Sequence, residues 1–128
     1  MIVVDTSVWI NALRDQKSAE ARHLSDLLDS DEVAIAIPIR LELISGARRS
    51  DQPRLSRTLS ALPTFYPNAT TWQRIEGWLG TIKNAGDWFG VGDLLIAGIG
   101  AENHAAIWSS DGDFARMAKL KLIELYRP

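Results

Sequence analysis

The sequence predicts an α/β fold in which a mostly parallel sheet lies between layers of helices. Short runs of β-branched residues alternate along the chain with longer segments whose apolar residues recur at helical spacing. Gly, Pro, Asn and Asp separate these segments, as expected for turns. With 128 residues and 46% hydrophobic content, the chain can bury one core but hardly two. We therefore expect one domain over residues 1–128.

The first half of the chain should begin with a buried strand over residues 1–4, which ends at Asp5. Thr6 or Ser7 can cap the helix that follows. Pro38 should open a later helix, since its missing N–H costs nothing in a first turn. In chain order, the expected elements are a strand over 1–4, helices over 6–13 and 18–28, a strand over 33–37, helices over 38–46 and 52–62, and a strand over 64–66.

The second half should contain a long helix over 70–84 that Gly86 closes. Asp93 should begin an apolar helix, in which Gly98 and Gly100 are expected to pack closely against the sheet. A strand over 105–109 follows. Asp111 then caps a short helix, and a final strand is expected over 122–126.

Four acidic residues fall at the ends of predicted strands or in the first turns of helices. Asp5 ends the first strand, and Asp111 follows the fourth. Glu42 lies one turn into the helix after the second strand, and Asp93 opens the apolar helix. Because functional sites in parallel sheets lie at the carboxyl edge, we expect these side chains to converge there. Each acid taken alone could equally be a helix cap.

Converging carboxylates repel one another, so they need a cation or must take up protons. Oxygen ligands suit Mg²⁺, for which Mn²⁺ can substitute, and these ions also coordinate phosphate oxygens. This chemistry indicates hydrolysis of phosphodiester bonds. The chain has no cysteine, which excludes thiolate sites and cysteine nucleophiles. Its two histidines, His23 and His104, do not follow strands and are expected to be structural or on the surface.

Arginines cluster in residues 40–57, although the formal net charge of the chain is −2. Arg40, Arg48 and Arg49 are candidate contacts to a phosphate backbone. Solvated helix faces are an equally good interpretation. The N-terminus lacks the basic lead of a signal peptide, and the longest apolar run, 94–101, is too short to span a bilayer. Together with the absence of cysteine, this favours a soluble, cytoplasmic protein with no membrane contact.

Four blocks resemble one known family, the PIN-domain ribonucleases, and within it the VapC toxins of toxin–antitoxin pairs. The blocks are DTSVWI at 5–10, RLELISGA at 40–47, VGDLLIAGIGAENHA at 91–105 and SSDGDFARM at 109–117. The resemblance covers the chain from end to end. It implies a three-layer α/β/α sandwich with a five-stranded parallel sheet in the order 3-2-1-4-5, and metal-dependent endoribonuclease activity on single-stranded RNA.

The resemblance also assigns roles to residues of this chain. Asp5, Glu42, Asp93 and Asp111 take the positions of the catalytic, metal-binding acids. Thr6 and Ser7 match a hydroxyl position that helps to hold a ligand or a water molecule. Asp113 matches an acidic position that is catalytic in some members and a salt-bridge partner in others. Ser110 departs from the pattern, because many relatives carry a basic residue there.

The resemblance further implies a homodimer and a small VapB-like antitoxin that lies across the catalytic groove. Five tryptophans offer material for the core and for such surfaces. Trp9 and Trp108 have apolar neighbours and are expected in the core. Trp72 and Trp78 lie six residues apart on one predicted helix, so their faces differ, and at least one is a candidate surface residue.

Other classes fit less well. A phosphorylated receiver domain needs a second acid beside the first, but Val4 and Thr6 flank Asp5, and Pro38 follows the second strand. A haloacid-dehalogenase-like phosphatase needs an Asp at position 7, where this chain has Ser7. Two alternatives stay open: a PIN fold that only captures RNA or a partner, and a PIN nuclease of ribosomal RNA processing. The second is disfavoured, since such proteins commonly carry further domains.

Overall fold

Four short parallel strands form the centre of the computed structural model, which describes residues 1–128. They are β1 (Ile2–Val4), β2 (Val33–Ala36), β3 (Thr64–Phe65) and β4 (Ala106–Trp108), in the spatial order β3-β2-β1-β4. Ile2 of β1 pairs with Val33 of β2 on one side and with Ala106 of β4 on the other. This confirms the predicted order of the first four strands.

The predicted fifth strand is reduced to a single bridge between Leu125 and Ile107 at the outer edge of β4. Ile107 N donates to Glu124 O at 2.9 Å, and Tyr126 N donates to Ile107 O at 2.8 Å. Before this bridge, Lys121 adopts a left-handed backbone conformation with φ 62°, so the chain is still turning there. The last segment therefore lies in the position of a fifth strand, but it pairs with β4 too briefly to form one.

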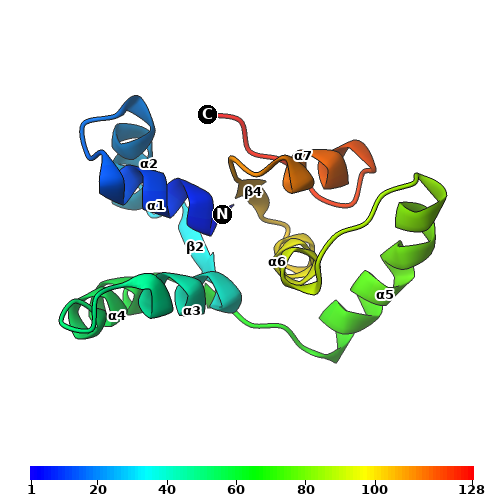
Figure 1. The fold of residues 1–128 in the computed structure, drawn as a ribbon, viewed down its shortest axis with the longest axis horizontal. Coiled ribbons are helices and arrows are strands. Elements are labelled where there is room, and N and C mark those ends of the chain that lie inside the picture. Colours follow the sequence, from blue (N-terminus) through cyan, green and yellow to red (C-terminus); the bar gives the residue numbers. More distant parts are fainter.

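Seven helices cover the sheet, four on one side of the strands and three on the other (Figure 1). The first side has α1 (Thr6–Arg14), α2 (Ala19–Asp29), α3 (Ile37–Gly46) and α4 (Gln52–Ser60), and the second has α5 (Ala69–Asn84), α6 (Val91–Glu102) and α7 (Gly112–Lys119). This is the arrangement that right-handed crossovers produce when the chain steps outward from β1 in both directions. It confirms the three layers that the sequence predicts.

Strands β1 and β2 are buried on both faces, which explains their uninterrupted apolar sequences. Val3, Ile35 and Ile107 are fully buried in a core of 28 residues that includes side chains from both helical layers. Trp9 and Trp108 belong to this core, as predicted. Trp72 is 45% exposed, and Trp78 is only partly buried against the core.

Most helix boundaries follow the predicted capping residues, but the start of α6 differs from the prediction, and this difference affects the site. Asp111 is the N-cap of α7, and its Oδ1 accepts a hydrogen bond from Asp113 N at 2.9 Å. Gly86, at φ 75°, follows the end of α5 as predicted. In contrast, α6 begins at Val91 with Gly90 as N-cap, so Asp93 lies inside the first turn. Asp93 is therefore not a helix cap, which frees its carboxylate for other contacts.

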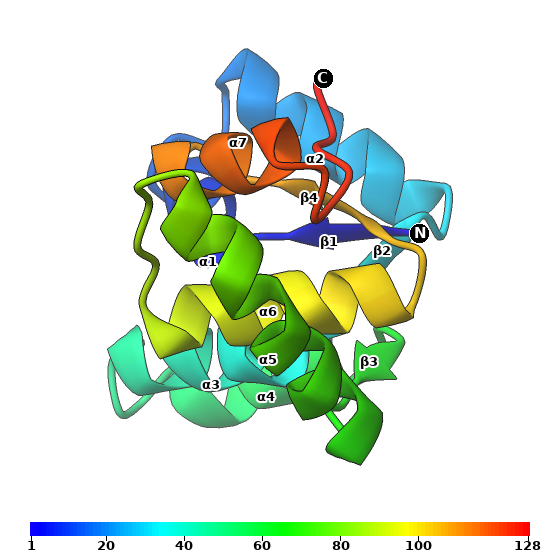
Figure 2. The same cartoon turned by 90° about the vertical axis from the view of Figure 1, so that its right-hand side faces the viewer.

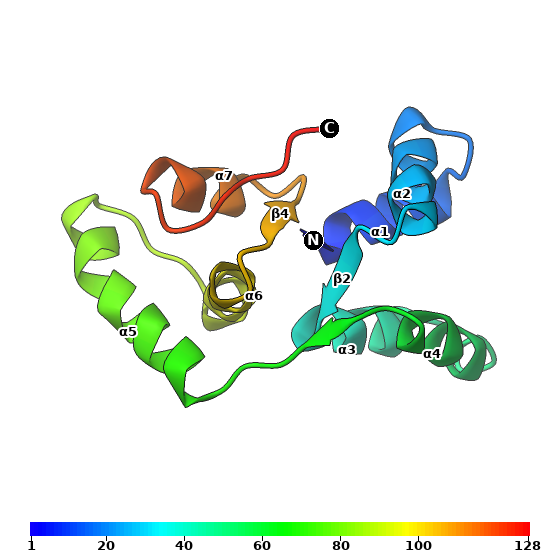
Figure 3. The same cartoon turned by 180° about the vertical axis from the view of Figure 1, so that it is seen from behind.

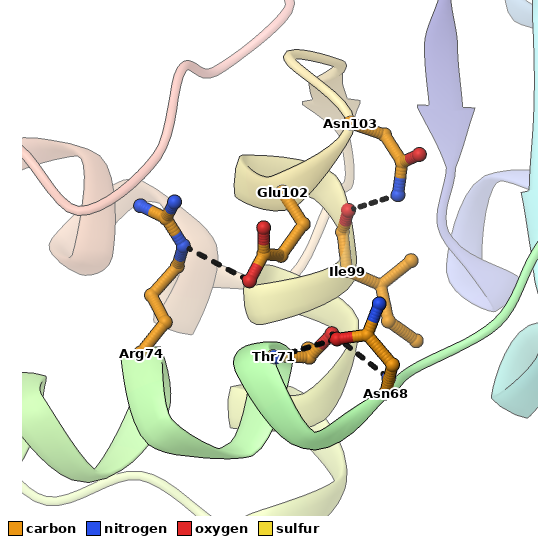
Figure 4. Close-up of polar contacts among 6 residues, drawn as sticks. All are labelled: Asn68, Thr71, Arg74, Ile99, Glu102 and Asn103. Carbon is orange, nitrogen blue, oxygen red and sulfur yellow. Dashed lines mark hydrogen bonds and ion pairs between the residues drawn. The ribbon is translucent and has the colours of Figure 1, made fainter.

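Helices α5 and α6 are neighbours (Figure 3) and pack closely at the C-terminal half of α6. A Cβ on Gly98 would lie 2.8 Å from side-chain atoms of Ile75, so this glycine packs against α5. The prediction that Gly98 packs against the sheet is therefore wrong. Gly100 does face the sheet, with Ile107 as neighbour. An Asn68–Thr71 capping box and an ion pair between Arg74 and Glu102 lie along the same contact (Figure 4).

Candidate metal centre

The carboxyl ends of β1 and β4 meet at one edge of the sheet. In Figure 2, β1 points towards the edge at which α6 and α7 begin. Asp5 follows β1 directly, and Ser109 follows β4. Because β1 and β4 are neighbours in register, with Val4 opposite Trp108, these two residues come side by side.

Asp5 is buried, with 7% of its surface exposed, and its carboxylate is held by two hydroxyl groups. Ser7 Oγ donates to Asp5 Oδ2 at 2.9 Å, and Ser109 Oγ donates to the same oxygen at 2.8 Å. Ser7 Oγ also accepts a hydrogen bond from Ser110 N at 3.2 Å. Although Asp5 is the N-cap of α1, its side chain makes no capping bond. Its carboxylate is therefore held by the hydroxyl groups of Ser7 and Ser109 and not by backbone N–H groups of α1.

Three carboxylates gather next to this pair of serines. Asp93 from α6, together with Asp111 and Asp113 at the start of α7, place one oxygen each within 4.8 Å of one another. Asp111 N donates to Ser109 Oγ at 2.9 Å, which connects the cluster to Asp5 through a single side chain. The cluster thus contains two of the four predicted acids, Asp93 and Asp111, together with Asp113, and Asp5 lies beside it.

The surroundings of Asp93 raise its pKa from 3.8 to about 7. Burial is the largest cause, followed by a hydrogen bond that protonated Asp93 makes with Asp113, and then by the negative charges of Asp111, Asp113 and Asp5. Asp93 therefore keeps its proton near neutral pH first because it is buried, and then because negative charge gathers around it. A cation at this point would oppose the contribution of the negative neighbours to the shift.

Asp113 makes two kinds of contact at once, and its catalytic role stays a prediction. The guanidinium of Arg116 donates to Asp113, which lowers the pKa of the Asp113 carboxyl, and the hydrogen bond from Asp93 lowers it further. Arg116 also donates to Asp87 Oδ1 at 2.7 Å, in the loop before α6. Asp113 is therefore a salt-bridge partner and a member of the acidic cluster.

Glu42 is the predicted acid that contacts neither the three carboxylates nor the residues around Asp5. Its side chain is exposed on α3 and has no recorded contact with them. At the level of elements it is near, since α3 contacts both α1 and α6. Its membership of the site stays a prediction. Among the supporting hydroxyls, Ser7 contacts Asp5 as described, whereas Thr6 Oγ1 is buried without a hydrogen-bond partner.

The three arginines lie in different surroundings. Arg40 is half-buried, and its Nη2 donates to Ser56 Oγ at 2.9 Å and to Ser60 Oγ at 3.1 Å. It therefore ties α3 to α4. Arg48 and Arg49 are exposed between these two helices and form no ion pair, so they are available to an external anion. Contact of any of the three with a substrate stays a prediction.

The sequence analysis did not identify Ser109, Arg116 and Asp87 as residues that hold the acidic side chains of the site in place. Ser109 carried a detectable signal, since it follows β4 as Asp5 follows β1, and polar residues at strand ends line such edges. Arg116 and Asp87 are 29 positions apart, and no local pattern predicts their pairing. His23, which bonds to Tyr126 Oη at 2.6 Å, and exposed His104 are outside the cluster, as predicted.

The donor set fits a small hard cation. Every group in it is a carboxylate oxygen or a serine hydroxyl, and no nitrogen or sulfur ligand is present. Such sets favour Mg²⁺ or Mn²⁺ over softer metals. Asp93, Asp111 and Asp113 would hold the ion, with Asp5 beside them. The serines would keep Asp5 in place, as hydrogen-bonded neighbours of metal ligands generally do.

Comparison with known proteins gives a consistent set of relatives. The PIN domain family matches residues 2–120. The VapC ribonuclease Mb1587 of Mycobacterium bovis is 30% identical over 125 residues, which cover 94% of this chain and 93% of the relative. Ribonuclease VapC11 of Mycobacterium tuberculosis has the same identity and coverage.

Solved structures with the same fold include VapBC2 from Rickettsia felis bound to a DNA fragment from its promoter. The TM-score is 0.78 at 20% identity, with 98% of both chains covered. At this identity the likeness concerns the fold. None of the helices combines the length and apolar character that crossing a membrane requires.

Proposed function

The chain belongs to the PIN-domain family and, within it, to the VapC ribonucleases, and from this premise we propose that it is an Mg²⁺- or Mn²⁺-dependent endoribonuclease. The observation that carries the proposal is the cluster of Asp93, Asp111 and Asp113 at the sheet edge, beside buried Asp5. In this role the protein hydrolyses phosphodiester bonds in RNA as the toxin of a VapBC-type pair.

Each residue of the cluster has a defined task in this proposal. Asp93, Asp111 and Asp113 would hold the ion, which when bound would make a water molecule more acidic and offset negative charge on the phosphate. Asp93 loses its proton to solvent on binding, because its pKa of about 7 results from burial and from negative neighbours. Ser7 and Ser109 keep Asp5 Oδ2 oriented. Arg48 and Arg49 bind backbone phosphates, and Glu42 joins from α3.

A cleavage assay tests the proposal. Labelled single-stranded RNA is incubated with the protein and Mg²⁺, with and without a chelator, alongside Asp5→Asn and Asp93→Asn. Asp26→Asn, an exposed acid on α2, is the matched control. We expect cleavage that stops with chelator, falls at least about 100-fold in both site variants and is unchanged in the control. Cleavage that persists in chelator would contradict the proposal. Binding without cleavage would favour the RNA-capturing alternative.

We further propose a VapB-like antitoxin as partner and a homodimer as assembly. The supporting observations are the VapBC complexes with the same fold and the exposed apolar side chains Ile10 and Leu13 on α1 and Leu41 on α3, two helices in contact. Co-expression with the antitoxin should abolish cleavage and slow hydrogen exchange in α1 and α3. Light scattering on the toxin alone should give twice the mass of one chain.

A further inference from the structure

The loop between α5 and α6 carries the most exposed large apolar side chain of the protein. Trp88 is 79% exposed, whereas its neighbour Phe89 is 4% exposed in the core. Exposed tryptophan is unfavourable in water and is typical of binding surfaces. Nothing in the proposed chemistry of the carboxylates requires an aromatic side chain here.

Arg116 fixes this loop beside the acidic cluster. Its guanidinium donates to Asp87 on one side of Trp88, and its Cζ lies 4.8 Å from the centre of the Phe89 ring on the other side. The same guanidinium donates to Asp113, a member of the cluster. Both neighbours of Trp88 are therefore held by one side chain that also touches the metal centre.

The Trp88 ring itself lies against the start of α6. Its Cη2 is 4.0 Å from the Cβ position of Gly90, the N-cap of α6, and Asp93 lies in the first turn of this helix. Trp88 also lines a cavity of about 370 Å³ with Leu79, Ile82, Lys83, Asp87, Phe89 and Leu94. An aromatic face and a lysine thus lie together, a short distance from the carboxylates.

We propose that Trp88 is a stacking platform for an unpaired RNA base adjacent to the cleaved phosphate, with Lys83 contacting the backbone. The inference rests on the proposed function, because the cluster is what brings the phosphate to this edge. Aromatic side chains bind single-stranded RNA by stacking on base faces, and cationic neighbours follow the phosphates. The alternative occupant, an amphipathic helix of a partner protein, would need a groove long enough to hold apolar side chains from two helical turns. This cavity is too small for a helix, and the one acid in its lining, Asp87, is already paired with Arg116, which leaves the charge of Lys83 for an anionic ligand.

A comparison of an oligonucleotide that has bases with one that lacks them distinguishes base stacking on Trp88 from attraction between the protein and the charged backbone. The assay uses the Asp93→Asn background, in which cleavage is impaired, and compares fluorescein-labelled oligouridylate with an abasic oligomer of equal length. Trp72→Ala is the matched control, since Trp72 is also an exposed tryptophan on α5, roughly 18 Å along the helix from its C-terminal end. The Trp88 side chain is exposed, so Trp88→Ala should fold normally.

We expect Trp88→Ala to weaken oligouridylate binding roughly fivefold to a hundredfold and to leave the abasic probe unaffected. Trp88→Phe should recover most of the loss, and Trp72→Ala should bind like the background. An equal effect on both probes, or none, overturns the inference. So does a Trp88→Ala variant that binds RNA normally but no longer dimerises or binds its antitoxin. RNA cleavage by the unmutated protein decides the proposed function separately.

Discussion

Asp93 lies where burial and like charge act together. Its carboxyl faces Asp111, Asp113 and Asp5, and only Asp113 has a cationic partner, Arg116. Asp93 therefore keeps its proton up to about pH 7, and the neutral carboxyl group removes one negative charge from the cluster. A site of this kind folds without its ion at a cost in stability, and that cost depends on pH.

The first prediction concerns this pH dependence. Between about pH 4 and 7 the folded protein holds a proton on Asp93 that the unfolded chain has released, so the stability of the metal-free protein falls as pH rises through that window. Asp93→Asn should remove this slope. At pH 8 it should stabilise the fold by on the order of 1 kcal/mol, a value reduced by solvent screening.

Urea unfolding in chelator at several pH values measures the effect, with Asp26→Asn as control. The lowered pKa of Asp113 acts only in acid, below about pH 4, so it does not interfere in this window. If Asp93→Asn destabilises the protein at pH 8, Asp93 has a structural role that its position in α6 does not indicate.

Ser109 carries the second prediction. It donates to buried Asp5 and accepts from Asp111 N, so Ser109→Ala removes a contact from two site residues at once. Loss of such a supporting hydrogen bond should lower Mg²⁺-dependent cleavage about 10- to 100-fold. Ser110→Ala, the adjacent exposed serine whose hydroxyl makes no hydrogen bond, should cleave normally. Equal activity of the two variants would remove Ser109 from the site.

At the scale of elements, α5 packs against α6, the helix that carries Asp93 in its first turn. Gly98 allows the two helices to approach closely at Ile75, whereas Gly80, also in a helix, has nothing within 4 Å of its Cβ position. The two glycines therefore make a matched pair. One is required by packing, and the other only lowers helix propensity.

The third prediction follows from this pair. Gly98→Ala should destabilise the protein by about 1–3 kcal/mol, because the new methyl group overlaps Ile75. Gly80→Ala should stabilise it by about 0.5–1 kcal/mol. Chemical denaturation of both variants checks the signs. A Gly98→Ala variant as stable as the wild type would mean that α5 and α6 are free to move apart.

Local signals predicted most elements and failed where pairing is long-range. Strands β1 and β2, the α5 stop at Gly86 and the Asp111 cap follow from residues adjacent in sequence. The α6 start was predicted two residues late, because Asp93 has the chemistry of a cap but not the position of one. The fifth strand is shortened to a single parallel bridge, because its length depends on contact with β4 across the fold. The positions of Glu42 and Arg116 likewise depend on packing between helices.

At the scale of the whole molecule, the two halves of the chain each supply part of one site. The N-terminal half provides Asp5 and Ser7, and the C-terminal half provides Ser109 and the three clustered aspartates. β1 and β4 join the halves at the centre of the sheet. A cation bound there would join the start of α6 to the start of α7 beside Asp5, so it should stabilise the fold.

The central claim is that Asp93, Asp111 and Asp113 form one cation site, and calorimetric titration with Mg²⁺ tests it most directly. At pH 6.5, in buffers of different ionisation enthalpy, the wild type should bind Mg²⁺ and release a proton, since Asp93 is largely protonated there. Asp93→Asn should bind at least about tenfold more weakly and release none. Mg²⁺ binding that is identical in the two proteins, with no proton released, would contradict the account.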